Sequence, residues 1–267
     1  MSLTANTPAM ARAATDPSRR TARIAGLLYL LTFVSIPTLA LYNPIRDHAD
    51  FILGAGSDTG VMWGAFSEVI VGIAGVGTAV VLFPVLKRQS ETAALGLLAA
   101  RLLETTLIFV SVISLLTIIT LRSDVAGTAG ADKASLTTTG HTLLAVYDRT
   151  FLLSQSLMPV FCDLLLGYVL YRSRLVPRIF PIVAFVGAPL LLASDVAIFF
   201  GVYDRVAPIA GVAVLPVAVF ELSLGVWLVV KGFNPSSPVM ARQTTDVVIP
   251  APRTSTRRPD ERSAEVV

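Results

Sequence analysis

The chain has 267 residues, of which 54% are apolar and only 15% are charged. A soluble domain has about 25% charged residues, which it needs to cover its surface. The composition therefore excludes an ordinary soluble protein and predicts that lipid faces much of the surface. The net charge of +3 comes from basic residues beside long apolar runs, which is typical of helix flanks at a membrane and does not indicate nucleic-acid binding.

Six apolar runs are long enough to cross a bilayer as helices, because a helix rises about 1.5 Å per residue through about 30 Å of hydrocarbon. In chain order, we predict transmembrane helices at 24–42, 61–86, 93–121, 145–171, 179–202 and 208–230. Strands of a membrane β-barrel are about ten residues long with alternating polarity, whereas these runs are longer and apolar on every side. The sequence predicts an all-α fold, a polytopic bundle of six transmembrane helices.

The orientation follows from lysines and arginines near the helix ends, since cytoplasmic loops carry the excess of positive charge. Ten such residues lie on one side of the predicted bundle, namely Arg12, Arg19, Arg20, Arg23, Lys87, Arg88, Arg172, Arg174, Arg178 and Lys231. Four lie on the other side, namely Arg46, Arg122, Lys133 and Arg205. We expect a multi-pass protein of the cell (cytoplasmic) membrane with both termini in the cytoplasm.

The chain divides into three predicted regions. Residues 1–23 and 232–267 lack a periodic apolar pattern and are expected to be disordered cytoplasmic tails, and 24–231 is the transmembrane domain. The first apolar run has an alternative interpretation as a signal peptide cleaved after Ala40. That run is longer than the usual 7–15 or so residues, which favours a retained helix.

Five stretches between residues 23 and 231 carry a recognisable pattern. They are 23–29 (RIAGLLY), 77–87 (GTAVVLFPVLK), 101–104 (RLLE), 171–178 (YRSRLVPR) and the last helix, with Glu221 followed by Trp227-Leu228. In combination they resemble bacterial multi-pass membrane proteins of domain-of-unknown-function family 4386. The resemblance implies a six-helix membrane protein and supplies no catalytic or binding residues.

Charged residues inside the predicted helices are the candidate functional residues of this sequence. A charge at bilayer depth costs about 2.5–3.5 kcal/mol on insertion scales, so such residues are rare and usually have a structural or functional role. Counting along the helices places Arg101, Glu104, Asp163 and Glu221 in one inner layer, between the cytoplasmic half and the midplane. Arg101 and Glu104 share a helix face, and the guanidinium fork suits Arg101 to hold a second carboxylate. Our hypothesis is that Arg101 organises this layer.

A second, outer layer is predicted from Glu68, Asp148, Arg149 and Asp195. Each layer then holds three carboxyl groups and one arginine, so some of the acids must be neutral or solvated. The sequence leaves two interpretations open. The layers are either a relay or solute site between helices, or buried pairs that fix helix packing.

Enzyme signatures in the sequence are thin, and no serine is paired with a recognisable base. His48 and His141 fall in or near the predicted outer loops, and the 47–50 stretch (DHAD) is more typical of a solvated turn than of a metal site. No HExxH, GxSxG or Walker motif occurs. We expect no metal and no cofactor, and the sequence favours a protein that is not an enzyme without deciding the question.

Three functions remain in contention. The first is a transporter of a small solute, or an ion-coupled carrier, centred on Arg101, Glu104, Asp163 and Glu221. The second is a non-catalytic membrane protein that binds a partner or lipid and has a purely structural polar core. The third is a membrane enzyme that acts on lipid. A water-reachable cavity at the inner layer would favour the first or the third, whereas a dry, paired cluster would favour the second. Besides the lipid bilayer, the sequence identifies no partner and no oligomeric state.

Overall fold

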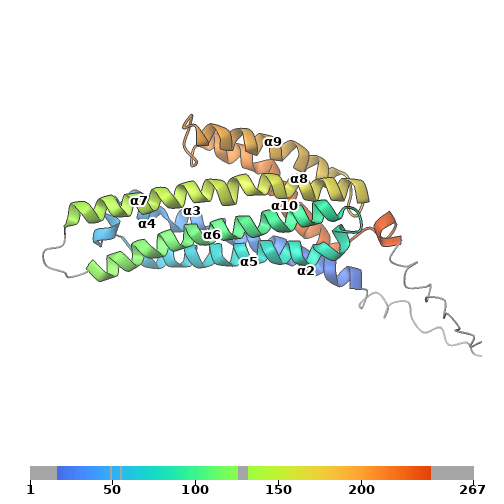
Figure 1. Ribbon diagram of the computed structural model, residues 1–267, viewed down its shortest axis with the longest axis horizontal. Helices are drawn as coiled ribbons and strands as arrows, with labels where there is room; N and C mark the ends of the chain where they lie inside the picture. Colours follow the sequence, from blue (N-terminus) through green and yellow to red (C-terminus); the bar gives the residue numbers. More distant parts are fainter. Residues whose placement is uncertain (1–16, 49, 55, 126–131, 242–267) are drawn as a thin grey trace, which may run out of the picture.

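The described part of the protein is built entirely from helices. A computed structural model describes residues 17–241 apart from 49, 55 and 126–131, and these residues form no strand (Figure 1). Five helical segments are long and apolar enough to cross a membrane, namely Asp58–Leu86, Glu91–Asp124, Lys133–Ser173, Ile179–Phe199 and Pro208–Val230. The predicted all-α bundle is confirmed, with five candidate spans among the described residues against the six predicted, and the chain is a multi-pass membrane protein.

Four of the long helices lie close to their predicted ranges. They are α5 (Asp58–Leu86), α6 (Glu91–Val125), α9 (Ile179–Phe199) and α10 (Pro208–Val230). The range of α10 agrees exactly with the prediction, and the largest difference is at the end of α6, at residue 125 against 121. Long apolar runs with clear polar flanks are therefore sufficient to place these helices.

The first predicted helix, 24–42, is not continuous. Its place is taken by α2 (Pro17–Thr32), a 3-10 turn η1 (Phe33–Ser35), and the short helices α3 (Thr38–Leu41) and α4 (Asn43–Asp47). Pro37 and Pro44 interrupt the helical hydrogen bonds at this point. The Thr32 hydroxyl also donates to the Tyr29 carbonyl at 2.7 Å, which competes with the regular helix.

Helix α2 also begins earlier than predicted, inside the region expected to be a disordered tail. Residues 17–23 are helical, and a proline at the first helical position is favourable because its missing N–H has no partner there anyway. Residues 1–16 lie outside the described residues.

The fourth predicted helix, 145–171, starts twelve residues earlier, at residue 133, within a 41-residue helical segment. The segment consists of α7 (Lys133–Phe151), a π-helical stretch η3 (Leu152–Leu157) and α8 (Met158–Ser173). The Asp132 carboxylate caps its start by accepting from the N–H groups of residues 134 and 135, at 3.1 and 3.3 Å. The first turns of α7 are too polar to count as a membrane span by composition, although they readily form a helix.

Residues 232–241, which follow α10, are folded where the sequence predicted disorder. The Ser237 hydroxyl donates to the Ser173 carbonyl at 2.7 Å, and the Asn234 N–H donates to the Leu175 carbonyl at 2.8 Å. These bonds attach residues 232–241 to the loop that follows α8. The prediction of a disordered tail is wrong for this segment.

Apolar side chains explain why the segment docks. Phe233, Val239 and Met240 are buried and belong to the same core as the long helices. Three apolar anchors among polar neighbours are enough to bind a short segment, although they do not form a periodic pattern. Residues 242–267, the rest of the predicted tail, lie outside the described residues.

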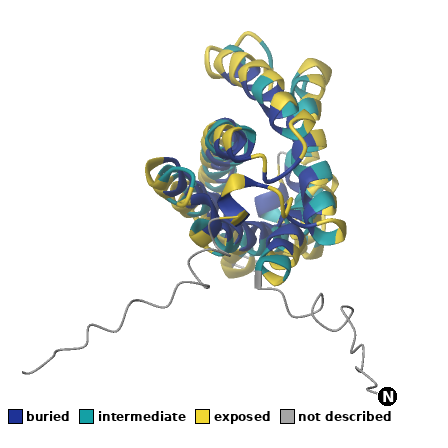
Figure 2. Ribbon diagram, turned by 90° about the vertical axis from the view of Figure 1, so that its right-hand side faces the viewer, coloured by how far each residue is buried: buried dark blue, intermediate teal, exposed yellow. Residues whose placement is uncertain are grey.

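Six of the described helices form a ring. Each packs against two neighbours, in the order α2, α5, α6, α8, α9, α10 and back to α2. Figure 2 looks along the bundle and shows buried residues toward the inside and exposed residues toward the outside. The exposed faces carry large apolar side chains such as Trp63, Ile113 and Ile209, which suit a lipid environment.

The ring has two ends that differ in charge. The basic end is where α2 begins and α10 ends, and it carries Lys87, Arg174, Arg178 and Lys231 (Figure 1). The distal end is where α6 ends and α7 begins. The main hydrophobic core fills the half of the ring near the basic end, and a second core, which includes Phe51 and Tyr147, lies toward the distal end.

Candidate functional site

A buried arginine joins two carboxylates inside the ring. Arg101 Nη1 donates to both carboxylate oxygens of Glu104, at 3.1 and 2.9 Å, and Arg101 Nη2 donates to Glu221 Oε1 at 3.2 Å. Glu104 lies one turn further along α6, whereas Glu221 is on α10. The guanidinium fork thus holds one carboxylate on its own helix and another on a different helix.

Two further side chains complete this polar cluster. Arg101 Nη2 donates to the Tyr29 hydroxyl at 3.4 Å, and the guanidinium lies over the Tyr29 ring at 5.7 Å from its centroid. The Cys162 thiol donates to Glu104 Oε2 at 3.8 Å. Helices α2, α6, α8 and α10 therefore all contribute to one centre, which we call the central cluster (Tyr29, Arg101, Glu104, Cys162, Asp163 and Glu221).

Asp163 is the unusual member of the central cluster. It follows Cys162 on α8 and is fully buried, with 0% of its surface exposed. Neither of its carboxylate oxygens has a hydrogen-bond partner among the described residues. A buried carboxyl group without a partner is costly, so it needs a proton, a water molecule or a bound cation.

A cavity of about 190 Å³ lies against the central cluster. Arg101, Glu104 and Glu221 line one side of it, and Thr32, Gln155 and Val214 are among the residues that line the rest. Several water molecules fit in this volume. The cluster therefore borders a cavity with both polar and apolar walls and is not enclosed by apolar side chains alone.

A larger cavity of about 580 Å³ lies on the distal side, between η3, α9 and α10. It shares Gln155 and Val214 with the smaller cavity. A third cavity, of about 260 Å³, shares Arg46 and Arg205 with the large one and also reaches Asp148. Shared walls make these cavities a series that runs from the distal end of α9 and α10 to the central cluster.

Several buried polar atoms on the wall of the large cavity lack a partner. The Ser156 hydroxyl donates to Asp195 Oδ1 at 2.5 Å, but Asp195 Oδ2 has no partner among the described residues. The same is true of Gln155 Nε2 and Arg205 Nε. Because buried polar groups are normally hydrogen-bonded, these atoms mark a space that polar molecules can occupy.

The π-helical stretch explains how Gln155 and Ser156 reach this space. A π-helix inserts one extra residue per turn and rotates the side chains that follow, and it occurs often at functional sites. Pro159, just after it, lacks a backbone N–H and could not complete a regular α-helical turn. The sequence therefore requires a local irregularity here, and the irregularity turns polar side chains toward the cavities.

Toward the basic end, apolar side chains close the ring. About one turn beyond Arg101, Asp163 and Glu221 lie Leu97, Leu166 and Leu224, which are 3%, 0% and 0% exposed. All three belong to the main hydrophobic core. The central cluster thus borders a cavity on its distal side and a closely packed apolar layer on the other side.

The predicted outer layer does not form one cluster. Glu68 accepts from the Tyr147 hydroxyl at 2.8 Å, and Asp195 is bound to Ser156 as described above. Asp148 accepts from Arg46 and from Arg205, the latter at 3.1 Å. These acids therefore have three separate sets of partners.

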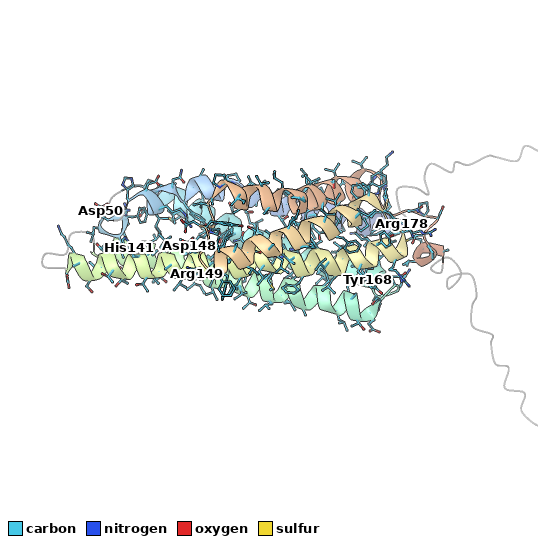
Figure 3. The ribbon with its side chains drawn as sticks, turned by 90° about the horizontal axis from the view of Figure 1, so that it is seen from above. Asp50, His141, Asp148, Arg149, Tyr168 and Arg178 are labelled. Atoms are coloured by element: carbon cyan, nitrogen blue, oxygen red, sulfur yellow. The ribbon has the colours of Figure 1, made fainter. Side chains whose placement is uncertain are left out.

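Arg149 is not a partner of the buried acids. It is exposed, although it follows Asp148 directly in the chain (Figure 3). Arg149 was predicted in the outer layer beside Asp148, but it points elsewhere, because neighbouring helical residues point about 100° apart. Arg46 and Arg205, which the sequence assigned to loop flanks, take that role.

Sequence reasoning also missed Tyr29, Gln155 and Ser156. A signal for the last two was present, since residues 154–156 (SQS) form a polar triplet within a long apolar run. Tyr29 had no such signal, because a tyrosine near a membrane surface is common. As for metals, the described residues hold no group of three or more His, Cys, Asp or Glu side chains that could bind an ion.

Apolar helices arranged around a buried polar centre and a cavity define a multi-pass membrane protein. The chain matches the family model described as "Domain of unknown function (DUF4386)" over residues 24–232, and it belongs to that family. No curated protein and no solved structure matches the chain.

Proposed function

We propose that the protein is a transporter of a small cationic solute in the cell membrane, ion-coupled, with the central cluster as its binding site. The observation that carries the proposal is the cavity lined by Arg101, Glu104 and Glu221. Arg101 pairs with both glutamates, but a structural core alone would not require a cavity of about 190 Å³ beside these pairs. This cavity instead supports a site for a solute.

The charge of the site supports a cation as cargo. Within the small cavity, one arginine faces two glutamates, and the buried Asp163 adds a third carboxyl group behind them. Three carboxyl groups share one guanidinium there, and in a medium of low dielectric constant the unpaired one needs a proton or a bound cation. A cation or a proton is the ligand that such a site stabilises.

The direction of access supports transport in particular. Cavities extend from the central cluster toward the distal end, whereas Leu97, Leu166 and Leu224 close the other side. A transporter that alternates between two openings has this form in one of its states. Orientation with the basic end in the cytoplasm then makes this the outward-facing state.

Cysteine accessibility tests the proposal. In a Cys162→Ala background, we would place single cysteines at Val214, on the wall shared by both cavities, and at Thr32, on the small cavity. Intact cells would be treated with a membrane-impermeant thiol reagent. We expect both cysteines to react, because a thiol reacts as the thiolate and needs water around it.

Two controls make the result specific. Leu224→Cys lies in the packed layer, and Val219→Cys lies on α10 with an exposed side chain that would face lipid. Neither should react. Protection of Val214→Cys by one member of a panel of small amines and monovalent cations would identify the cargo class. Unreactive Val214→Cys and Thr32→Cys, in variants that fold, would overturn the proposal and favour a structural or partner-binding role.

A further inference from the structure

The basic end of the bundle carries a pocket that the central cluster does not use. It has a volume of about 570 Å³ and lies where the loop after α8 meets the chain after α10. Three basic side chains line it, Arg174, Arg178 and Lys231, together with Trp227 and Asn234. All of these belong to the described residues, and no carboxylate is among the residues that line the pocket.

The three basic groups are not paired with acids. None of them forms a salt bridge with a described carboxylate, although each is exposed at the pocket. Arg178 is instead held over the ring of Tyr171, at 4.8 Å from its centroid. Three unneutralised cations around one hollow create a positive potential that attracts an anion.

The chain places these groups by ordered backbone. Arg174 adopts a left-handed conformation with φ of 53°, which ends α8 and turns the chain. Its carbonyl accepts from the Asn234 side-chain amide at 3.3 Å, so the two walls of the pocket are joined. The pocket is therefore part of the fold and does not depend on chance side-chain positions.

The surroundings of the pocket are those of a membrane interface. Trp227 packs against Phe180 with ring centroids 5.4 Å apart, and aromatic side chains of this kind gather at the level of lipid headgroups. Below the pocket, Ile179, Ile182 and Val226 are exposed on α9 and α10. An acyl chain could lie along that apolar surface while its headgroup occupies the pocket.

We propose that this pocket binds the phosphate of an anionic phospholipid. Figure 3 labels one of its basic residues, Arg178, at this end of the bundle. Basic pockets between helices on the cytoplasmic side suit such headgroups. The tail of the chain itself is a poorer occupant, because residues 242–267 carry five arginines against four acidic side chains. A lipid supplies the phosphate and the apolar chain together.

Lipid titration of the purified full-length protein tests this site. Phosphatidylglycerol and phosphatidylcholine with identical acyl chains would be added in detergent, and bound lipid would be counted by native mass spectrometry. We expect phosphatidylglycerol to bind more tightly. The double variant Arg178→Gln/Lys231→Gln should weaken its binding by roughly thirtyfold, because each basic group near the headgroup contributes.

The control is a double variant with the same change of charge at the same end, Arg172→Gln/Lys87→Gln. Both residues are exposed and neither lines the pocket. Its affinity for phosphatidylglycerol should change by less than threefold or so, as a general surface effect. A loss equal to that of the pocket variant would overturn the proposal, as would equal binding of the two lipids by the parent protein.

Inorganic phosphate distinguishes the two sources of the anion. If phosphate in solution displaces phosphatidylglycerol at comparable concentrations, the pocket binds a free anion and the lipid proposal is wrong. Melting temperatures in phosphatidylcholine serve as the check on folding, and we expect them to be unchanged in both double variants. The experiment does not involve the central cluster, so its outcome is separate from that of the transport proposal.

Discussion

Arg101 Nη2 lies 3.2 Å from Glu221 Oε1, although α6 and α10 are not neighbours in the ring of helices. The contact therefore crosses the interior. Each helix packs sideways against the next, and this pair is a direct link between opposite sides. Its removal should affect the assembly of the whole bundle more than the loss of one surface ion pair would.

The first prediction concerns Arg101→Ala. We expect it to destabilise the bundle by about 3 kcal/mol or more, because Glu104 and Glu221 are left buried without their partner. Melting temperature and monodispersity in detergent would measure this. Arg149→Ala is the control, since Arg149 is exposed and should change little. An Arg101→Ala protein as stable as the control would refute the organising role of Arg101.

The second prediction concerns the closest approach of two helices. A Cβ added at Gly26 on α2 would lie 2.6 Å from the carbonyl oxygen of Gly225 on α10. Backbone cannot move aside as a flexible side chain can, so Gly26→Ala should cost about 1–3 kcal/mol. Gly211→Ala on α10 meets nothing within 4 Å and should not lower the melting temperature. Equal melting temperatures for the two variants would contradict this packing.

The third prediction uses two adjacent residues that differ in contacts. Asp148 binds Arg46 and Arg205 and so links α7 to α4 and to the loop before α10, whereas Arg149 is exposed. Asp148→Asn should cost about 1 kcal/mol, since the pair is partly exposed to solvent. It should also speed protease cleavage around Arg205, as limited proteolysis would show. Arg149→Gln should leave both quantities unchanged, and cleavage at equal rates in the two variants would speak against the link.

The fourth prediction concerns the segment after α10. Val239 is 2% exposed and packs in the main core, while Ser236 is exposed. Val239→Ala should lower stability by about 1 kcal/mol through the lost burial of two methyl groups. Ser236→Ala is the control and should behave as the parent in the same thermal melt. If Val239→Ala has the same melting temperature as the parent protein, the segment is not docked in the membrane-embedded state.

The inner layer could be anticipated from sequence because its signal is energetic and local. Charged residues deep in the membrane are expected to pair with one another, and the position of a residue along its helix gives its depth. The sequence could therefore predict that Arg101, Glu104 and Glu221 lie together. Which face each residue occupies also depends on neighbouring helices. For that reason Arg149 was assigned to the outer layer and Arg205 was not.

Irregular backbone was the other source of error. The interruption after Thr32 and the π-helical stretch before Pro159 depend on how hydroxyl groups and prolines compete with helical hydrogen bonds. Hydropathy measures how apolar a segment is and does not register that competition. The docked segment 232–241 was missed for a related reason, since three apolar anchors stabilise it without any periodic pattern.

The length of two helical segments has a consequence for the shape of the distal end. The segment Lys133–Ser173 has 41 residues, which at 1.5 Å per residue is about 60 Å, roughly twice the thickness of the hydrocarbon layer. Helix α6 runs beside it, and both extend past the end of α9 (Figure 1). Arg122 on α6 donates to the carbonyls of Phe51 and Gly54, at 2.8 and 3.0 Å. These hydrogen bonds attach the projecting end of α6 to the segment before α5. This end of α6 and α7 therefore extends beyond the hydrocarbon layer. An antibody raised against it would label intact cells if this end is extracellular, and only permeabilised cells if it is cytoplasmic.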